Sequence, residues 1–188
     1  MRVIAGKYRS RQLHSLPGLE LRPTADRLRE TLFNVLTAGN PDALQGSVWF
    51  DLYAGTGAVG IEALSRGASM VLFVESDIHA AELIRKNLAS LEITAGFQVL
   101  QQDSIRALRR LESGGTHPDF VFLDPPYHAE KAYATTLAAL AQSPLLKPAT
   151  LVIAEHQKRF DPGDQFESLC RTRKLVQGDG ALSFYERK

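Results

Sequence analysis

A strand-like segment that leads into an acidic residue, two prolines and a tyrosine is the most specific chemical signal in the chain. The apolar stretch Phe120–Leu123 is followed directly by Asp124-Pro125-Pro126-Tyr127. Each proline fixes its own φ and restricts the residue before it, so this turn holds the Asp124 carboxylate and the nearby carbonyls in one arrangement. An exocyclic base nitrogen is a poor nucleophile because its lone pair is delocalised into the ring. We expect Asp124 and the Pro125 carbonyl to bind its hydrogens, and Tyr127 to stack on the base.

A glycine-rich turn between a strand-like and a helix-like segment is the second signal. Gly55, Gly57 and Gly60 have the spacing of the dinucleotide fingerprint Gly-x-Gly-x-x-Gly. Ligands bind at such turns in open parallel sheets. Glu75 lies where a ribose-binding acid is expected after this fingerprint. The spacing alone therefore fits both a nicotinamide dinucleotide and S-adenosylmethionine.

Asp51, just ahead of the glycine turn, favours the second of these cofactors. A loop that binds a pyrophosphate presents backbone amides to it, and an acidic residue beside them repels the ligand. S-adenosylmethionine has no phosphate and carries a cationic sulfonium and an amino group. Asp51 can attract these groups directly or through water, and Gly55 and Gly57 let the backbone approach the methionine part. We expect S-adenosylmethionine as methyl donor, S-adenosylhomocysteine as product, and no metal.

Acidic residues follow or end four consecutive predicted strands, at Asp51, Glu75, Asp103 and Asp124. The carboxyl ends of parallel strands meet at one edge of a sheet. We expect Glu75 to accept hydrogen bonds from the ribose hydroxyls, and Asp103 with Ser104 to meet the adenine amino group. Each acid alone could instead cap a helix N-terminus. The series as a whole predicts a donor site and a catalytic turn on one sheet edge.

Strand-like and helix-like patterns alternate from Ser47 onward, which is typical of repeated βαβ units and a parallel sheet. The predicted strands are residues 47–53, 70–75, 97–101, 119–123 and 150–154, and the predicted helices are residues 58–66, 78–91, 105–111 and 129–141. Residues 172–176 and 182–186 flank Gly178-Asp179-Gly180, which indicates an antiparallel hairpin at one edge. The chain is thus expected to be an α/β protein.

The first residues form a basic extension ahead of this domain. Residues 1–30 carry seven Lys and Arg against three acidic residues, although the whole chain has a net charge of only +1. Residues 2–6 and 10–16 look like two short strands, followed by an extended stretch to Pro23 and a helix over residues 24–38. We divide the chain into a basic β-hairpin extension, residues 1–23, and a catalytic domain, residues 24–188. The extension is suited to phosphate contact, or it is simply a solvated hairpin.

The sequence contains neither a predicted membrane span nor a predicted secretory signal. No apolar run approaches the roughly 20 residues that span a bilayer, and Met1–Arg11 lacks the apolar middle of a secretory signal. We therefore expect a cytoplasmic protein outside the membrane. The single cysteine, Cys170, can form neither an internal disulfide nor a cysteine metal cluster, and we interpret it as a structural thiol.

The glycine turn and the Asp-Pro-Pro-Tyr turn, in this order, resemble class I S-adenosylmethionine methyltransferases that act on amino groups, over roughly residues 45–188. Residues 2–6 and 22–34 narrow the resemblance to the RsmD family of bacterial 16S ribosomal RNA guanine-N2 methyltransferases. That resemblance implies a Rossmann-like, seven-stranded, mostly parallel sheet with an antiparallel C-terminal hairpin. It also implies transfer to the exocyclic N2 of a guanine in 16S rRNA, within an assembling small ribosomal subunit, and we expect a monomer.

Carried over by motif, the donor site consists of Asp51, Gly55, Gly57, Glu75 and Asp103, and the catalytic turn spans residues 124–127. The candidates for contacts with RNA phosphates are Arg9, Arg11, Arg22, Arg27 and Arg29. An intramolecular ion pair of the nearby arginines with Asp26 or Glu30 is an equally open interpretation.

Several other functions fit part of this sequence pattern. Related turns methylate adenine N6 in RNA or DNA, and an Asn-Pro-Pro-Tyr form acts on glutamine side chains, which Asp124 disfavours. Sequence-specific DNA enzymes usually carry a sizeable recognition domain, whereas only about 45 residues precede the cofactor motif here. A nicotinamide-dependent oxidoreductase leaves Asp51 and the Asp-Pro-Pro-Tyr turn unexplained. A non-catalytic RNA chaperone needs neither motif.

Overall fold

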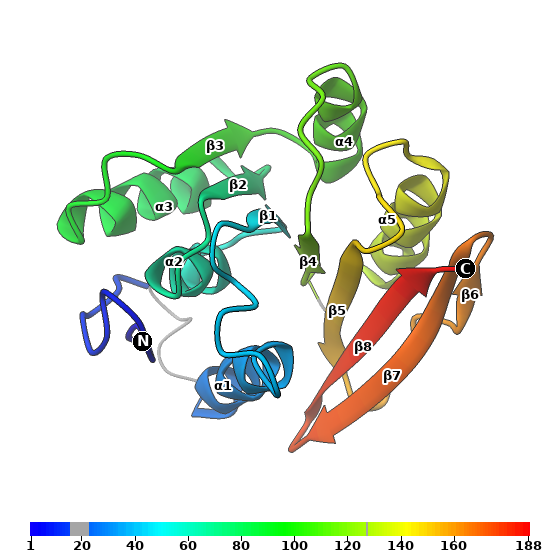
Figure 1. Ribbon diagram of the computed structural model, residues 1–188, viewed down its shortest axis with the longest axis horizontal. Coiled ribbons are helices and arrows are strands. Elements are labelled where there is room, and N and C mark those ends of the chain that lie inside the picture. The colour runs from blue at the N-terminus through cyan, green and yellow to red at the C-terminus, as the bar shows by residue number, and fades with distance from the viewer. Residues whose placement is uncertain (16–22, 127) are drawn as a thin grey trace.

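A single mixed sheet of eight strands, covered by helices on both faces, organises the computed structural model of the protein (Figure 1), which describes residues 1–15, 23–126 and 128–188. The strands are β1 Val48–Leu52, β2 Met70–Glu75, β3 Phe97–Gln101, β4 Phe120–Leu123, β5 Leu151–Gln157, β6 Gln165–Phe166, β7 Leu169–Gln177 and β8 Gly180–Arg187. The helices are α1 Pro23–Leu36, α2 Ala58–Ser65, α3 Ile78–Ser90, α4 Ser104–Glu112 and α5 Glu130–Gln142. The strand order is β3-β2-β1-β4-β5-β8-β7-β6.

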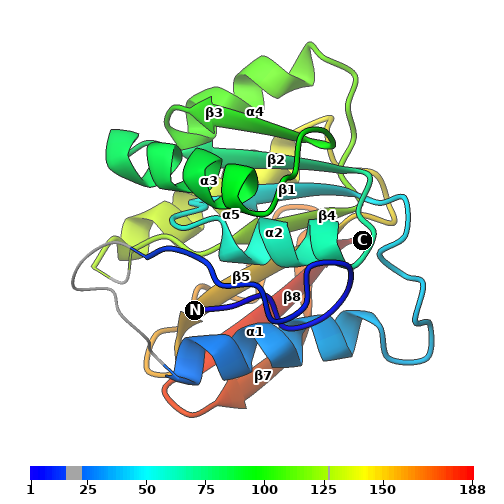
Figure 2. The same cartoon turned by 90° about the vertical axis from the view of Figure 1, so that its left-hand side faces the viewer.

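The helices divide into two layers that bury opposite faces of the sheet. Helices α1, α2 and α3 lie on one face, and α4 and α5 lie on the other (Figures 1 and 2). Trp49, Phe73 and Phe122 point into the first layer, while Phe50, Val74 and Val121 point into the second. This alternation follows from the period of two along a strand. Both faces of the central strands are therefore apolar, as in the continuous hydrophobic runs of the sequence.

The strand pairing confirms the predicted βαβ pattern and its C-terminal hairpin. Strand β1 pairs in parallel with β2 and β4, and β4 pairs in parallel with β5. Strand β8 is antiparallel to both β5 and β7. The strand count differs from the seven that the family resemblance implied, because the two residues of β6 fold back onto the start of β7, where Phe166 pairs with Leu169. Glu167 between them adopts a positive φ, which gives the tight turn that adds this eighth strand.

The predicted N-terminal hairpin is reduced to one isolated antiparallel bridge, between Arg2 and Gln12. The backbone amides of Ile4 and Ala5 donate instead to the carboxylate of Glu62 in α2, at 2.7 and 2.9 Å. In a two-stranded hairpin alternate amides donate across the ladder, and the Val3 amide does so to the Arg11 carbonyl at 3.0 Å, so continuing the ladder would need the Ala5 amide. The side chain of Glu62 therefore attaches the N-terminal segment to α2, and the two predicted strands do not form.

A second buried side chain links this segment to the glycine turn. The side-chain oxygen of Asn87 accepts from the His14 amide at 2.7 Å. Its nitrogen donates to the carbonyls of His14 and Thr56, at 3.1 and 3.0 Å. In Figure 2 the N-terminal segment runs beside α2 and α1, across the face that these helices cover. Residues 1–15 are thus an integral part of one helical layer.

Helix α1 begins one residue earlier and ends two residues earlier than predicted. Proline fits the first helical position because it lacks an amide that would have no helical partner there, so Thr24 lies inside the helix and does not precede it. Beyond Leu36, a residue with positive φ, Gly39, ends the segment. The predicted extended stretch up to Pro23 falls largely on residues 16–22, outside the described residues. The division at residue 23 stays a prediction.

Two further observations concern the described part of the chain. None of its helices is long and apolar enough to cross a membrane. Cys170 lies half-buried in β7 as an unpaired thiol.

Candidate active site

The sheet edge at which β1, β2 and β4 end collects the predicted acidic residues. Asp51 lies in β1 and Glu75 ends β2, while Asp103 follows β3 and Asp124 follows β4. Strands β1 and β4 are neighbours, with Leu52 in register with Leu123. The glycine turn and the Asp-Pro-Pro-Tyr turn therefore leave adjacent strands at the same edge.

Two of these acids hold the glycine turn in place. The Gly55 amide donates to Oε2 of Glu75 at 2.8 Å, and the Gly60 amide donates to Oδ2 of Asp51 at 2.9 Å. Gly55 and Gly57 both have positive φ, at 55° and 77°. A backbone conformation that other residues rarely adopt is thus stabilised by bonds to two strand-end carboxylates.

The three glycines have different roles. A side chain at Gly55 would meet nothing within 4 Å, which leaves open space beside the turn for a ligand. A Cβ at Gly57 would lie 3.2 Å from Ile84, and one at Gly60 would lie 2.3 Å from Phe73. The missing side chain of Gly57 allows α2 to pack closely on α3 and the sheet. Its predicted role in clearing space for the donor stays a prediction.

Asp51 is an almost completely buried carboxyl, 2% exposed. Burial raises its pKa well above the usual range, the Gly60 amide opposes this shift, and the charges of Asp124 and Glu75 add to it. Several acids that destabilise one another's ionised forms are all stabilised by a bound cation. The electrostatics of this edge therefore favour a positively charged ligand.

Glu75 and Asp103 differ in how far they are already engaged. Glu75 accepts from the amides of Gly55 and Asp77. It is not the N-cap of the next helix, because Asp77 caps α3. Asp103 is exposed and caps α4 through the Ile105 and Arg106 amides, at 3.0 and 3.2 Å. The N-cap interpretation therefore holds for Asp103 and not for Glu75. Asp103 keeps its second carboxylate oxygen for a ligand.

Ser104, predicted to meet the adenine together with Asp103, has a buried side chain. It is the first residue of α4, and only 3% of its surface is exposed. Of this pair, Asp103 is the more exposed residue. The contact of Ser104 with the adenine stays a prediction.

The catalytic turn is tied to its neighbours on both sides. Asp124 is half-buried and Pro125 is buried. The hydroxyl of Tyr133, in α5, donates to the carbonyl of Glu155 at 2.8 Å and lies 3.4 Å from the carbonyl of Pro125. The carbonyl of Pro126 accepts from the Ala129 amide at 2.7 Å. Tyr127 lies outside the described residues, so its stacking role stays a prediction.

The whole chain is similar to proteins of one family. The family model described as "Conserved hypothetical protein 95" matches residues 1–186. Ribosomal RNA small subunit methyltransferase D of Haemophilus influenzae is 39% identical, covering 84% of this chain and 79% of its own length. The protein of the same name from Escherichia coli is 32% identical, covering 100% of this chain and 90% of its own length. The chain belongs to the RsmD family.

A solved structure supports the same assignment. The structure described as "Putative methyltransferase yhhF from Escherichia coli" has a TM-score of 0.83 and 32% identity, covering 100% of this chain and 98% of its own. The Rossmann-like class I fold and the RsmD resemblance inferred from the motifs are thereby confirmed.

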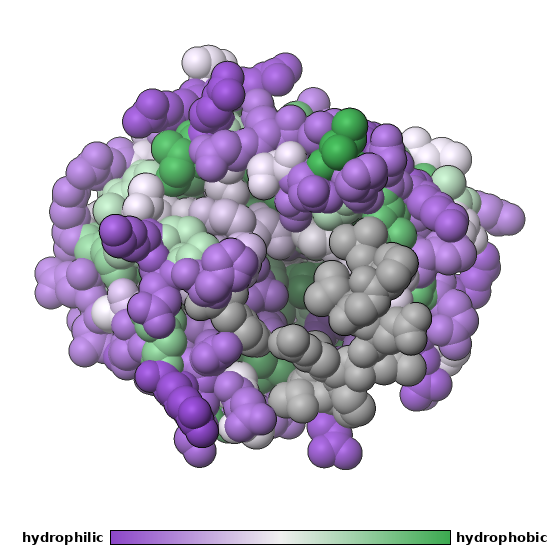
Figure 3. All heavy atoms as spheres, turned by 180° about the vertical axis from the view of Figure 1, so that it is seen from behind, coloured by the Kyte–Doolittle hydropathy of each residue, from purple (hydrophilic) through white to green (hydrophobic). Residues whose placement is uncertain are grey.

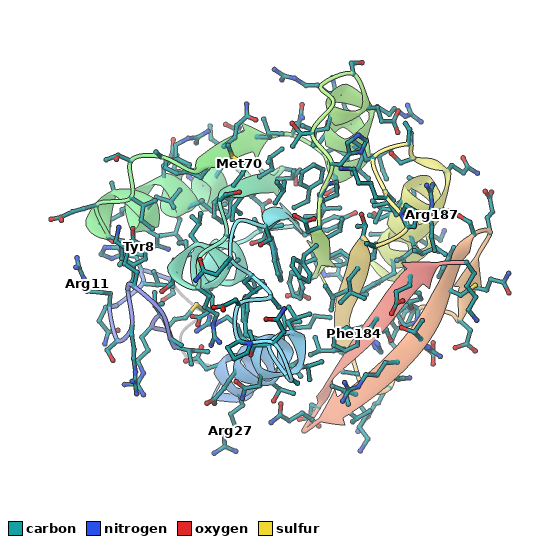
Figure 4. The ribbon with its side chains drawn as sticks, in the orientation of Figure 1. Tyr8, Arg11, Arg27, Met70, Phe184 and Arg187 are labelled. Carbon is teal, nitrogen blue, oxygen red and sulfur yellow. The ribbon has the colours of Figure 1, made fainter. Side chains whose placement is uncertain are left out.

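The arginines proposed for RNA contact in this RsmD member are not equivalent. Arg9, Arg11 and Arg27 are exposed, and Figure 4 shows Arg27 pointing away from the body of the molecule. The Arg11 guanidinium also donates to the carbonyl of Ser90 at 2.9 Å. Arg22 lies outside the described residues. These exposed positions leave Arg9, Arg11 and Arg27 as predicted contacts.

The prediction that Arg29 contacts RNA phosphates is wrong, because only 4% of this residue is exposed. Its Nη2 donates to the carbonyl of Arg2 at 2.7 Å and lies 3.2 Å from the Asp26 carboxylate. The intramolecular ion pair with Asp26, which the sequence left open, is therefore the one that forms. This buried guanidinium is therefore not presented at the surface for a phosphate contact.

Glu155 is an acidic residue at this edge that the sequence interpretation missed. It lies in β5, 8% exposed, and its pKa is raised well above the usual range by burial and by the charge of Asp124, while Arg29 opposes the shift. The rule that identified the other acids also applies here, because Glu155 directly follows the predicted strand 150–154. A fifth strand-end acid was thus present in the pattern.

The raised pKa of Glu155 has a measurable consequence for stability. At pH values above the ordinary glutamate pKa of about 4.3, the folded state disfavours the ionised form more than the unfolded state does, so stability is lost as pH rises through the folded pKa. We expect Glu155→Gln to raise Tm at pH 8 by at least about 3 °C, roughly the effect of 1 kcal/mol in a domain of this size. Calorimetric scans should show this gain disappearing near pH 4.

Glu130→Gln provides the matched control, since Glu130 is an exposed carboxyl in the first turn of α5. Its Tm should follow that of the natural protein from pH 4 to pH 8. A Glu155→Gln variant that is no more stable than the natural protein at pH 8 contradicts the prediction.

Figure 3, seen from behind the view of Figure 1, shows a mostly hydrophilic surface that is hollowed near its centre. Among the described residues, no group of three or more His, Cys, Asp and Glu side chains is arranged to hold a metal ion.

Proposed function

We propose that the protein transfers a methyl group from S-adenosylmethionine to the exocyclic N2 of a guanine in 16S ribosomal RNA. One observation carries this proposal: the glycine turn and the Asp-Pro-Pro-Tyr turn leave adjacent parallel strands, with Leu52 in register with Leu123. Neighbouring strands are about 4.8 Å apart. A donor held by one turn and an amine held by the other can therefore meet. Membership in a family with rRNA methyltransferases supports the reaction class.

The donor is bound by the acids of the sheet edge. Asp51 and its neighbouring carboxylates supply the negative potential that suits the sulfonium and the amino group of the methionine part. Glu75 accepts hydrogen bonds from the ribose hydroxyls with its remaining lone pairs, and Asp103 accepts one from the adenine amino group. The open space beside Gly55 admits the methionine part.

Transfer needs little beyond orientation. The amine nitrogen attacks the methyl carbon as the carbon–sulfur bond breaks, and S-adenosylhomocysteine leaves as a neutral thioether. Asp124 and the Pro125 carbonyl bind the amine hydrogens, which concentrates the lone pair on nitrogen, and Asp124 accepts the proton that the methylated amine then loses. Holding both reactants in line supplies much of the acceleration.

The substrate and its location follow from the same proposal. The exposed Arg9 and Arg11 of the N-terminal segment and the exposed Arg27 of α1 contact rRNA phosphates in the assembling small subunit. The enzyme acts as a monomer in the cytoplasm. Adenine N6 is the competing acceptor, because its amino group presents the same hydrogens to Asp124.

One experiment distinguishes these acceptors. Purified protein is incubated with labelled S-adenosylmethionine and small ribosomal subunits that lack the modification, and the labelled nucleoside is identified by mass spectrometry. Labelled N2-methylguanosine is the expected product. N6-methyladenosine would retain the reaction class and reject the base. Tight NADH binding without affinity for S-adenosylmethionine or S-adenosylhomocysteine would reject the class and favour an oxidoreductase.

The donor site predicts a specific loss of affinity. Glu75→Ala should raise the Kd of S-adenosylmethionine and of S-adenosylhomocysteine by about 10- to 100-fold, the effect of losing one or two hydrogen bonds to a charged acceptor. Isothermal titration calorimetry measures both constants. Asp77→Asn is the matched control two residues away, because asparagine caps α3 as well as aspartate does. Equal losses in the two variants would contradict the role of Glu75.

A further inference from the structure

Glu155 occupies the position beside the catalytic turn on the neighbouring strand. Strands β4 and β5 are parallel, with Phe122 paired to Ile153 and Leu123 paired to Ala154, so the next positions in register are Asp124 and Glu155. Phe122 and Ile153 both pack in the layer of α1 and α2. Two residues further along, Asp124 and Glu155 follow on that same side. The two carboxyl groups are therefore neighbours at the end of the sheet.

The Glu155 carboxyl is buried without an internal partner. Within residues 1–15, 23–126 and 128–188 it accepts no hydrogen bond and forms no ion pair, although 92% of the residue surface is covered. Among the described residues, the polar side-chain atoms that are completely enclosed and lack a hydrogen-bond partner do not include the Glu155 oxygens. These oxygens are therefore not completely enclosed. A buried carboxyl with no donor is destabilising. A ligand that brings a donor to it is therefore stabilised on binding.

Charges around Glu155 make it a tunable acceptor. Asp124 acts from β4 and Arg29 acts from α1, and the two shift its pKa in opposite directions. Arg29 is itself buried, with Nη2 held by Arg2 and Asp26 and its Nε without a partner among the described residues. A donor bound to the carboxylate favours the ionised form. Arg29 thus supports an anion inside the protein.

Bases that carry an exocyclic amine differ at the adjacent ring nitrogen. In guanine, the C2 amine lies between N3, which is an unprotonated acceptor, and N1, which carries a hydrogen on the Watson–Crick edge. In adenine and cytosine, the ring nitrogen next to the amine is an unprotonated acceptor. Enzymes that act on an extruded base read this Watson–Crick edge with hydrogen bonds. An acceptor beside Asp124 would therefore pair with guanine and repel the other two.

We propose that Glu155 is a specificity-determining residue whose carboxylate accepts the N1–H of the target guanine while Asp124 holds the N2 amine. This inference rests on the proposed guanine-N2 activity and deepens it. The two carboxylates, on adjacent strands, bind two adjacent N–H groups of one base. Adenine presents a lone pair where Glu155 requires a hydrogen, so its amine is not held in line with the donor.

The test replaces the target guanine with 2-aminopurine, which keeps the C2 amine but has an unprotonated N1. The substrates are small subunits reconstituted from ligated 16S rRNA that carries guanine or 2-aminopurine at the nucleotide identified by mass spectrometry. The value of kcat/KM is measured on both for the natural protein, for Glu155→Gln and for Glu130→Gln. Comparing ratios cancels the effect of the 6-oxygen that 2-aminopurine lacks.

We expect Glu155→Gln to reduce the preference for guanine at least tenfold, because an amide can turn either its oxygen or its NH₂ toward N1. Glu130→Gln should keep the natural preference. An unchanged ratio, or an equal loss of kcat/KM on both substrates, would overturn the role of Glu155 and show a merely structural effect. A natural protein that forms no N2-methylguanosine on guanine subunits would instead refute the proposed function, and the inference would fall with it.

Discussion

Replacing Asp124 with alanine should lower kcat by on the order of 100- to 1000-fold while the protein stays folded. In the proposed function the Asp124 carboxylate is the charged acceptor for the substrate amine, and losing one preorganised hydrogen-bonding group in an active site has an effect of this size. Asp124 is half-buried at the end of β4 and not part of the apolar core, so Tm should change little. Single-turnover methylation of small subunits, with labelled donor, measures the chemical step directly.

The binding steps separate this role from a general disturbance of the site. Asp124→Ala should change the Kd of S-adenosylhomocysteine less than about tenfold, because Asp51 and Glu75 still hold the glycine turn. Asp124→Asn keeps one acceptor oxygen and should fall between alanine and the natural residue. Retention of more than a tenth of the natural kcat by Asp124→Ala would show that another group holds the amine.

Glu62→Ala should have the largest effect on stability, lowering the free energy of unfolding by about 3–5 kcal/mol. The Glu62 side chain is completely buried and accepts from the amides of Ile4 and Ala5 and from Nε of Arg66. Alanine leaves two backbone donors and a largely buried guanidinium without their acceptor. Urea titration followed by circular dichroism measures the change.

Two comparisons make this prediction specific. Glu62→Gln retains an uncharged acceptor and should lose less than Glu62→Ala does. Glu82→Ala removes an exposed carboxylate of α3, 65% of whose side chain is accessible, and should change stability by less than about 0.5 kcal/mol. If Glu62→Ala unfolds at the same urea concentration as Glu82→Ala, the attachment of the N-terminal segment contributes nothing to the fold.

The parallel sheet could be predicted because its signals are local. Apolar runs such as residues 70–75 and turns such as Gly178-Asp179-Gly180 specify strands and a hairpin within a few residues. The absence of the two N-terminal strands could not be predicted. The group that accepts from the amides of Ile4 and Ala5 is the side chain of Glu62, almost sixty residues away in the sequence. The two-residue strand β6 likewise depends on its pairing with β7.

The site shows the same division. The strand-end acids were predictable, since parallel strands bring their carboxyl ends together. The sequence left open which acids cap a helix and which arginines form ion pairs within the chain. In the structure Asp103 caps α4, and Arg29 turns inward to Asp26. Gly57 has the spacing of a ligand-binding glycine, yet its missing side chain accommodates Ile84. Roles of this kind depend on packing across elements, which no local pattern records.

The hydrogen bonds of Asn87 to both His14 and Thr56 affect how the N-terminus of this protein can be truncated. A fragment that starts at residue 24 keeps both sequence motifs, but it lacks His14, which holds the Asn87 side chain beside the Thr56 carbonyl in the glycine turn. We therefore expect the smallest active fragment to include residues 1–15. Purification tags belong at the C-terminus, where the chain ends on β8 and away from that contact.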